Sequence, residues 1–424
     1  MSGNSVFRHQ HSGILSLAAI EAPRVITSDW IDEQLAETYE RNGLRPGLLS
    51  GLAGIDERRW WDDDVSFADA AAMAGRAAIE KAGIDPSQIG ILISTSVCKE
   101  NIEPSVACAV HHQLGLPSSC LNFDIGNACL GFGNAIYVAA TMLDAGAIDY
   151  ALIVDGEGSR YTQETTLDRL RRPDASAGEV FAEFASLTLG SGAAAMVLAR
   201  TDRHPEAHRL VGGVARAATQ HNELCIGSLD RMTTDTHSLL VAGLDLAAEA
   251  WAEVAVHDEF NWAGGLDWYI LHQVSKVHTT MLCERLHIDQ AKAPLTYPKY
   301  GTASVNTLPK KAARSSRAPI NGRTAGLGTL LGRLTRLVYC ANQAAAAPSA
   351  APAATPCHPK GMVAAPATPP ITSRYGMIRR SCTRSNLEIL SNVDSRMVST
   401  TNVPIASQWL SQENVALVST PQSK

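Results

Sequence analysis

Long apolar runs that alternate with helical patterns constrain the fold of this chain more than any other feature. Residues 89–95 and 150–154 are continuous apolar runs, which are typical of strands buried on both faces. Before the first of these runs, residues 70–82 form an amphipathic pattern that follows the helix-capping Ser66 and stops at Gly83. Because buried strands need helices to cover both faces of their sheet, this alternation predicts an α/β protein.

The alternation begins again in the second part of the chain. Residues 266–271 predict a strand and residues 275–286 a helix, after an earlier strand and helix of the same kind. We therefore predict two duplicated halves, an N-terminal half at residues 1–205 and a C-terminal half at residues 206–341.

The composition changes after Gly301. Residues 1–301 carry 22 basic and 39 acidic side chains, whereas residues 302–424 carry 14 and 3. Residues 343–371 are rich in Ala, Pro, Ser and Thr, a composition that cannot bury a core. We therefore predict that residues 342–424 are a disordered tail. This basic tail lacks interleaved aromatic residues and an amphipathic period, so we expect no nucleic-acid binding and no membrane insertion.

The apolar segments are too short to cross a membrane. None reaches the roughly 18 residues that a spanning helix needs, and the N-terminus lacks a signal-peptide pattern. The nine cysteines form no CxxC pair, so the sequence suggests neither a metal site nor a disulfide framework. We expect a cytoplasmic protein without metal or cofactor.

Among the nine cysteines, Cys129 has the surroundings of a nucleophile. It follows a strand-like run at residues 121–125 and precedes an alanine-rich helical stretch at residues 134–147. A thiol at the start of a helix lies at the positive end of the helix dipole, which favours the thiolate that attacks carbonyls. A buried cysteine is more often structural than reactive, so this position alone leaves both interpretations open.

A histidine follows a predicted strand of the second half in the same way. His272 stands at the end of residues 266–271 and just before a helix, and the carboxyl ends of strands are where sites form in open α/β sheets. A duplicated fold would bring His272 and Cys129 together at the junction of the halves. A cysteine beside a hydrogen-bonding histidine suits acyl transfer through a thioester, although a lone histidine here is otherwise a packing or capping residue.

Six short motifs, in order, resemble the β-ketoacyl-ACP synthase III group of the thiolase superfamily. They are Gly54-Ile55 with Glu57-Arg58, Glu103-Pro-Ser105, Asn127-Ala-Cys129-Leu-Gly131, Gly190-Ser-Gly-Ala193, His272-Gln-Val-Ser275 and Tyr297-Pro-Lys-Tyr-Gly301. The resemblance spans residues 12–301 and ends there. It implies the thiolase-like αβαβα fold, an obligate homodimer, and acyl-CoA as a substrate rather than a cofactor.

Within that group the chain looks closest to the OleA type, whose members condense two long acyl-CoAs head to head in an olefin pathway. Glu103 lies 26 residues before Cys129, where that type places a glutamate that serves the partner subunit's site as a base. The runs Gly156-Glu-Gly-Ser-Arg160 and Thr165-Thr-Leu-Asp-Arg169 also resemble it. The resemblance leaves the acyl chain length and the residues that bind substrate undetermined.

The resemblance implies three catalytic residues and two half-reactions. Cys129 would take an acyl group from acyl-CoA, and Glu103 would remove the α-proton of a second acyl thioester, whose enolate attacks the acyl-enzyme to give a β-keto acid. His272 would hydrogen-bond the enolate oxygen, and the Cys129 N–H would serve the acyl oxyanion. A base must titrate near neutrality, so we expect Glu103 to be partly buried.

The alternative within the group is a malonyl-ACP-dependent synthase that initiates fatty-acid synthesis and uses acyl carrier protein. Such enzymes need no base at the position of Glu103, and they clamp the CoA adenine with Trp and Arg, which would fall at Leu48 and Leu52. Both differences favour the OleA type.

The motifs break off after Gly301. The group continues with Asn-Thr, and that asparagine partners the histidine, but here Thr302 stands in its place and Asn306 is out of register. A reading-frame shift near codon 302 would explain this break and the change in charge. A third alternative is therefore a non-catalytic or frameshifted homologue. The retained Cys129 and His272 argue against it.

Overall fold

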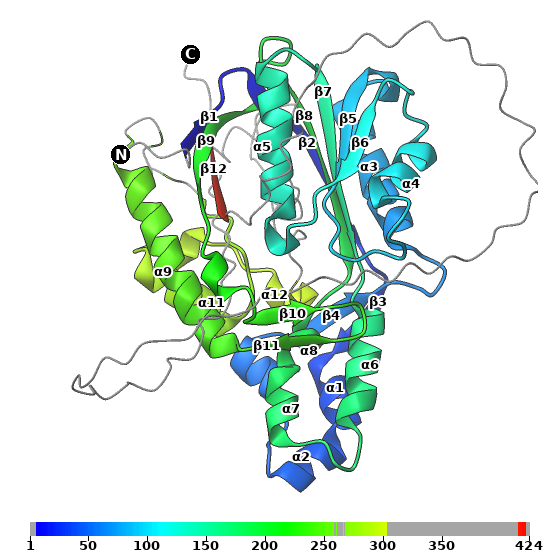
Figure 1. The fold of residues 1–424 in the computed structure, drawn as a ribbon, viewed down its shortest axis with the longest axis vertical. Helices are drawn as coiled ribbons and strands as arrows, with labels where there is room; N and C mark the ends of the chain where they lie inside the picture. The colour runs from blue at the N-terminus through cyan, green and yellow to red at the C-terminus, as the bar shows by residue number, and fades with distance from the viewer. Residues whose placement is uncertain (1–5, 258–259, 261–265, 267, 303–413, 421–424) are drawn as a thin grey trace, which may run out of the picture. The chain divides into compact units, whose positions relative to one another are not determined.

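The structure is a computed structural model that describes residues 6–257, 260, 266, 268–302 and 414–420 (Figure 1). The strands are β1 (Val6–Arg8), β2 (Ser12–Glu21), β3 (Arg24–Thr27), β4 (Glu57–Trp60), β5 (Ile89–Ser94), β6 (Leu121–Asp124), β7 (Tyr150–Glu157), β8 (Gly192–Arg200), β9 (His208–Arg216), β10 (Cys225–Gly227), β11 (Met232–Thr234) and β12 (Asn414–Thr420). The helices are α1 (Ser28–Gln34), α2 (Ala36–Asn42), α3 (Phe67–Ala82), α4 (Val106–Leu114), α5 (Gly131–Asp144), α6 (Arg160–Leu170), α7 (Ala177–Ala182), α8 (Phe184–Thr188), α9 (Thr236–Ala255), α11 (Lys276–Arg285) and α12 (Tyr297–Tyr300).

A mixed sheet organises the first half. Its strand order is β1-β9-β2-β8-β7-β5-β6, and β12 pairs with β9 beside this path. Strands β7, β5 and β6 run parallel, whereas β8 runs antiparallel to both β7 and β2. Helix α5 covers one face, and α3 and α4 cover the other (Figure 1). The α/β class predicted from the alternation is therefore confirmed.

The apolar runs are buried on both faces, as their composition predicts. Along β5, Ile91 and Ile93 pack into the cluster under α5, while Ile89 and Leu92 pack into the cluster under α3 and α4. Strand β7 divides its side chains in the same way. A strand that faces helices on both sides cannot alternate apolar with polar residues.

Local signals fix the helix that covers β5 and β7. Ser66 and Asp69 form a capping box at the start of α3, and Gly83 ends it in the left-handed conformation. In the interior of α3, small side chains, mainly alanines, lie against the sheet and are fully buried. This lets the helix pack close to the strands, and Gly156 of β7 approaches it so closely that a Cβ there would lie 2.1 Å from the Phe67 carbonyl oxygen.

The second half differs from the sequence prediction at residues 266–271. The described residues of this run, Leu266 and 268–271, form no paired strand, although Leu266, Tyr269 and Leu271 pack with α9 and α11. In the first half, by contrast, the apolar strand β5 is paired with both β6 and β7. Whether a run forms a strand depends on neighbouring strands as much as on its own residues, and no described strand lies beside this run.

The segment predicted as a disordered tail contains one strand. Asn414–Thr420 form β12, which pairs antiparallel with β9, and here the prediction for residues 342–424 is wrong. The β-branched and apolar residues of this short run favour an extended conformation, and β9 offers it an open edge. The pairing parallels the first half, where β2 pairs antiparallel with β8. The remainder of residues 342–424 lies outside the described part of the chain.

Candidate active site

The structure places Cys129 on a tight turn between β6 and α5. A 3₁₀ turn, Ala128–Leu130, joins the strand to the helix, and Ala128 has a φ of 41°, in the left-handed region. Helix α5 starts at Gly131, directly after the turn and three residues earlier than the sequence predicts. A Cβ on Gly131 would lie 3.0 Å from the Ile125 carbonyl oxygen, so a side chain here would be tightly packed against the end of β6. The nucleophile position therefore has the predicted strand–turn–helix geometry.

Burial, and not the helix dipole, dominates the ionisation of Cys129. Burial, together with the smaller effects of the nearby Cys225, Glu157 and Asp155, raises the pKa of this thiol to about 12, and the Cys129 N–H acts in the opposite direction. The expectation that the helix start favours the thiolate is therefore wrong for the isolated subunit. The sulfur stays protonated at neutral pH because desolvation destabilises the thiolate by more than the start of the helix stabilises it.

His272 is also neutral. It is 6 % exposed, and burial, followed by the neighbouring His278, lowers its pKa to about 3. The two rings meet edge to face, with centroids 6.2 Å apart. Among the described residues, the Nδ1 atom of His272 has no hydrogen-bond partner. A neutral imidazole can donate one hydrogen bond to a developing oxyanion without first losing a proton.

One apolar cluster joins the segments that carry the two predicted residues. Leu130 and Phe132, which flank Gly131 behind Cys129, share this cluster with Ile270, two residues before His272. All three side chains are at most 2 % exposed. The segments that carry Cys129 and His272 thus contribute to one core, and the meeting of the two side chains stays a prediction.

The glycine motifs of the two halves touch each other through the backbone. A Cβ on Gly190 would lie 1.9 Å from the Tyr300 carbonyl oxygen, and one on Gly301, at φ +67°, would lie 2.6 Å from the Thr188 oxygen. Arg58 is fully buried beside them and donates to the Leu187 carbonyl at 3.0 Å. Three motifs that are far apart in the sequence thus form one contact.

The His-Gln-Val-Ser motif is fixed by its glutamine. The Gln273 side chain accepts a hydrogen bond from the Thr296 N–H at 2.6 Å and donates one to the Pro294 carbonyl at 2.8 Å. Ser275 caps α11 by accepting from the His278 N–H at 3.1 Å. His272 is therefore held between a bound glutamine and a capped helix, which limits the movement of its ring.

Thr302 lies beside this motif but does not replace an asparagine side chain. Its hydroxyl donates to the Val274 carbonyl at 2.7 Å, and its N–H donates to the Thr188 carbonyl at 2.7 Å. The hydroxyl is thereby used on the backbone rather than on the His272 ring. Asn306, the other candidate, lies outside the described residues.

Glu103 is exposed, in contrast to the partial burial expected of a base. It lies on the segment between β5 and α4, next to Ile102, which is 98 % exposed. The carboxylates that act on the pKa of Cys129 are instead Glu157 and Asp155 of the same chain.

Sequence reasoning missed this buried carboxyl pair at the end of β7. Asp155 is 1 % exposed and Glu157 8 % exposed, and residues two apart lie on the same face of a strand. Burial raises the pKa of Asp155 and of Glu157, and the charge of Glu157 raises that of Asp155 further. The available signal was two acidic residues that directly continue an apolar strand.

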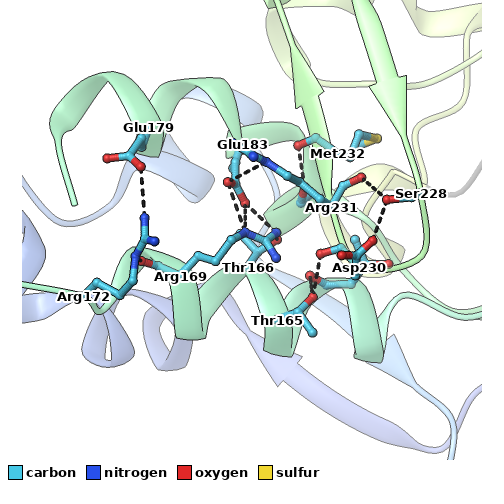
Figure 2. A network of polar contacts seen from close by, with 12 residues as sticks. Thr165, Thr166, Arg169, Arg172, Glu179, Glu183, Ser228, Asp230, Arg231 and Met232 are labelled. Carbon is cyan, nitrogen blue, oxygen red and sulfur yellow. Dashed lines mark hydrogen bonds and ion pairs between the residues drawn. The ribbon is translucent and has the colours of Figure 1, made fainter. Parts of the chain in front are cut away.

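Helix α6 carries the OleA-like run 165–169 and holds the β10–β11 hairpin (Figure 2). Thr165 donates to the Asp230 carbonyl at 2.8 Å, while Arg169 and Arg231 both pair with Glu183, at 2.7 and 3.3 Å. Because Glu183 is 2 % exposed, this ionic contact is shielded from solvent. The hairpin also carries Cys225, whose charge acts on Cys129.

Two general features complete the description of the site. No group of three or more His, Cys, Asp or Glu side chains in the described part of the chain could hold a metal ion. The helices of that part include none that is long and apolar enough to cross a membrane.

The comparisons with known proteins agree with this geometry. Residues 60–168 match the thiolase N-terminal domain family, and residues 123–214 match the 3-oxoacyl-[acyl-carrier-protein] synthase III family. The acyl-CoA:acyl-CoA alkyltransferase of Xanthomonas campestris is 44 % identical over 75 % of this chain and 95 % of its own length. That of Shewanella oneidensis is 32 % identical over 71 % and 89 %.

Solved structures give the same result. The cerulenin-bound OleA of Xanthomonas campestris superposes with a TM-score of 0.72 at 41 % identity, covering 79 % of this chain and 94 % of that one. A variant of the same OleA with bound lauric acid and lauroyl-CoA gives a TM-score of 0.71 at 41 % identity, over 78 % and 95 %. With the thiolase-like fold, the cysteine turn and the buried histidine in place, the chain belongs to the OleA family of acyl-CoA:acyl-CoA alkyltransferases in the thiolase superfamily.

Proposed function

We propose that this protein is an acyltransferase that joins two long-chain acyl-CoAs head to head through an acyl-Cys129 intermediate and yields a β-keto acid. The observation that carries the proposal is the 44 % identity with an acyl-CoA:acyl-CoA alkyltransferase over 95 % of its length. The retained Cys129 and His272, whose segments share one apolar cluster, support it. The same likeness favours acyl-CoA over malonyl-ACP as the second substrate.

In the first half-reaction, Cys129 attacks the thioester of acyl-CoA. The thiol proton leaves with the departing CoA sulfur, so that one thioester forms as the other breaks. Because the pKa of His272 is about 3, this residue serves as a neutral hydrogen-bond donor and not as the proton acceptor. The bound substrate would exclude water from the sulfur, which strengthens the hydrogen bonds to the developing oxyanion.

In the second half-reaction, Glu103 removes an α-proton from the second acyl-CoA. The enolate attacks the acyl carbonyl on Cys129, a carbon–carbon bond forms, and the Cys129 sulfur leaves as the thiolate and takes up a proton. Water then cleaves the CoA thioester of the product to give the β-keto acid and free CoA. His272 donates a hydrogen bond to the enolate oxygen.

The exposure of Glu103 supports a homodimer in which this residue enters the partner's site. Ile102 is 98 % exposed, and Leu121 on the edge strand β6 is 51 % exposed. An open strand edge with apolar side chains needs a cover, and a second copy of the chain provides one. There the partner would bury Glu103 beside the second substrate. The six described cysteines form no disulfide with one another, in keeping with the cytoplasmic location that we propose.

The test is the intact mass of the protein before and after incubation with lauroyl-CoA. We expect one lauroyl adduct, absent from Cys129→Ala, and release of CoA and β-keto acid on longer incubation. The Glu103→Ala variant should form the adduct but no condensed product. A wild-type chain that forms no adduct would contradict the proposal and favour a non-catalytic homologue. Condensation with malonyl-ACP alone would instead assign the chain to the initiating synthases.

A further inference from the structure

The segment that carries Glu103 begins beside the nucleophile turn. It connects β5 to α4 and starts at Thr95, whose Cβ and carbonyl oxygen each lie 3.3 Å from the position of a Cβ on Gly131. Residues 100–104 of this segment are exposed. The position of Glu103 therefore depends on how the two ends of the segment are held.

At the first end, the buried Glu157 carboxylate holds two backbone N–H groups. Its two oxygens accept from Val97 at 2.6 Å and from Cys98 at 3.2 Å. The Cys98 thiol donates to the Gly158 carbonyl at 3.2 Å, which ties the segment to the end of β7 a third time. A carboxylate that accepts two N–H groups in a dry site makes charge-assisted bonds, which are about twice as strong as neutral ones.

The protonation of Asp155 leaves this carboxylate ionised. Among the described residues, neither Asp155 oxygen has a hydrogen-bond partner, whereas the Glu157 oxygens face the two N–H donors. Burial and the charge of Glu157 raise the pKa of Asp155 well above its usual range, whereas the hydrogen bonds from Cys98 and Val97 partly offset the effect of burial on Glu157, so we assign the proton to Asp155 and the charge to Glu157. The pair thus carries one negative charge, at the atoms that bind the segment.

At the other end, a second carboxylate holds the start of α4. Asp124 accepts from the Ala107 N–H at 2.8 Å and from the Val106 N–H at 3.2 Å, and it pairs with Lys99 at 2.8 Å. The exposed residues 100–104 therefore form a short bridge between two fixed ends. Glu103 lies five residues beyond Cys98 and two before the helix cap Ser105.

We propose that Glu157 is a positioning residue that fixes the segment carrying Glu103 and so places the base in the active site of the partner subunit. The inference rests on the proposed function, in which Glu103 acts in that site. Glu157 itself touches no reacting atom. Replacing it by glutamine puts an amide NH₂ against one of the two N–H donors, so one hydrogen bond is lost and a buried donor is left without a partner.

The test uses mixed dimers of two differently tagged full-length chains. One chain carries Cys129→Ala and donates Glu103, and the other carries Glu103→Ala and donates Cys129, so each dimer has one complete site. We then add Glu157→Gln to either chain. In the Glu103-donating chain, we expect the kcat for condensation to fall about 30-fold, with acylation of Cys129 unchanged, because a displaced base affects only the second step. In the Cys129-donating chain, Glu157 acts on the pKa of Cys129, so we expect the acylation rate to change there, while the ratio of the condensation rate to the acylation rate changes less than threefold.

Two further results decide the interpretation. Glu157→Asp in the Glu103-donating chain keeps the charge, and we expect it to restore part of the lost kcat. An equal fall in the ratio of condensation to acylation from Glu157→Gln in the Cys129-donating chain would overturn the proposal, because it would place the effect in the site of the same subunit. So would an unchanged kcat in the Glu103-donating chain.

Hydrogen–deuterium exchange of the homodimer provides a readout that needs no turnover. We expect the Val97 and Cys98 amides to exchange at least tenfold faster in Glu157→Gln than in wild type, and to be unaffected by Glu40→Gln at an exposed helical carboxylate. Unchanged exchange would overturn the proposal whatever the condensation assay gives. Failure of the proposed function would be recognised separately, as a parent mixed dimer that forms neither adduct nor product.

Discussion

At the scale of single residues, the site consists of two groups that burial keeps uncharged. The thiol of Cys129 has a pKa of about 12 and the imidazole of His272 a pKa of about 3, so neither ionises at neutral pH before substrate arrives. A pre-formed thiolate–imidazolium pair, common where a cysteine is activated by a neighbouring base, is therefore absent from this part of the chain. The reactive form of Cys129 arises only as the thioester is attacked.

This ionisation predicts the alkylation behaviour of Cys129. At pH 8 a pKa of about 12 leaves about one thiol in ten thousand ionised, so iodoacetamide should label Cys129 about 1,000-fold more slowly than free cysteine. The rate should rise about tenfold per pH unit up to pH 10. Peptide mass spectrometry measures it, with the exposed Cys108 as an internal reference. A labelling rate that reaches its plateau below pH 8 would contradict this prediction and show that the protein stabilises the Cys129 thiolate.

The neutral His272 also predicts acid sensitivity. Its folded pKa of about 3 lies below the 6.5 of the unfolded chain, so its contribution to stability is complete above pH 6.5 and is lost as the pH falls from 6.5 towards 3. Between pH 6.5 and 5 this loss is about 2 kcal/mol. Urea unfolding at these two pH values measures the free energy of unfolding. Its loss between them should be smaller in His272→Asn than in the wild type by this amount. The raised pKa values of Asp155 and Glu157 change the free energy of unfolding in the opposite direction, because they favour the folded state at low pH. Both residues are present in the wild type and in His272→Asn, so their contribution cancels when the two proteins are compared.

At the scale of elements, close backbone contacts join the motifs of the two halves. Gly190 precedes β8, and Tyr300 closes α12 more than a hundred residues later, yet no side chain fits between them. The contact explains why both motifs carry glycine at these positions. Helices and strands that approach so closely transmit a displacement of one half directly to the other.

Gly190→Ala should therefore destabilise the protein strongly. Its Cβ would lie 1.9 Å from the Tyr300 oxygen, and overpacking of this kind costs about 3 kcal/mol. The matched control is Gly178→Ala in α7, where the nearest atom is 3.7 Å away and the change should be neutral or stabilising by up to about 1 kcal/mol. Urea unfolding of both variants measures the difference, and equal midpoints would contradict the contact.

The elements also separate what the sequence predicts from what it cannot. The strand–helix alternation and the capping residues predict β5, α3 and the turn at Cys129, because these signals are local. The strand expected at residues 266–271 and the thiolate expected at Cys129 are wrong, because strand pairing and desolvation depend on residues that are distant in the sequence. Glu157 was missed for the same reason, since its role comes from donors about 60 residues earlier.

At the scale of the whole molecule, a strand that is distant in the sequence joins the main sheet beside β9. Along β9, β12 is the antiparallel partner from Arg209 to Arg216, as β8 is for β2. The expected motifs after Gly301 are missing, and a reading-frame shift near codon 302 remains our prediction for their absence. Translation of the other two frames from that codon tests it, and the absence of an Asn-Thr-Gly continuation from both frames would contradict it.

Removing β12 measures its contribution directly. Truncation after residue 410 should lower the free energy of unfolding by about 3 kcal/mol, because cross-strand pairs contribute about 0.2–1 kcal/mol each and seven residues pair here. Truncation after Thr420 leaves the pairing intact and serves as the control. Equal urea midpoints for the two truncated chains would show that β12 adds nothing to the folded state.

The separation of β9 and β12 in the sequence also determines how long β9 lacks its partner strand during synthesis. About 200 residues separate Arg216 from Asn414, and at 5–20 residues per second a ribosome needs roughly 10–40 s to make them. During that interval the edge of β9 that later receives β12 is complete but unpaired, and an unpaired edge is a template for joining other chains. The yield of native protein in a cell should therefore depend on translation speed and on chaperones that shield the nascent chain.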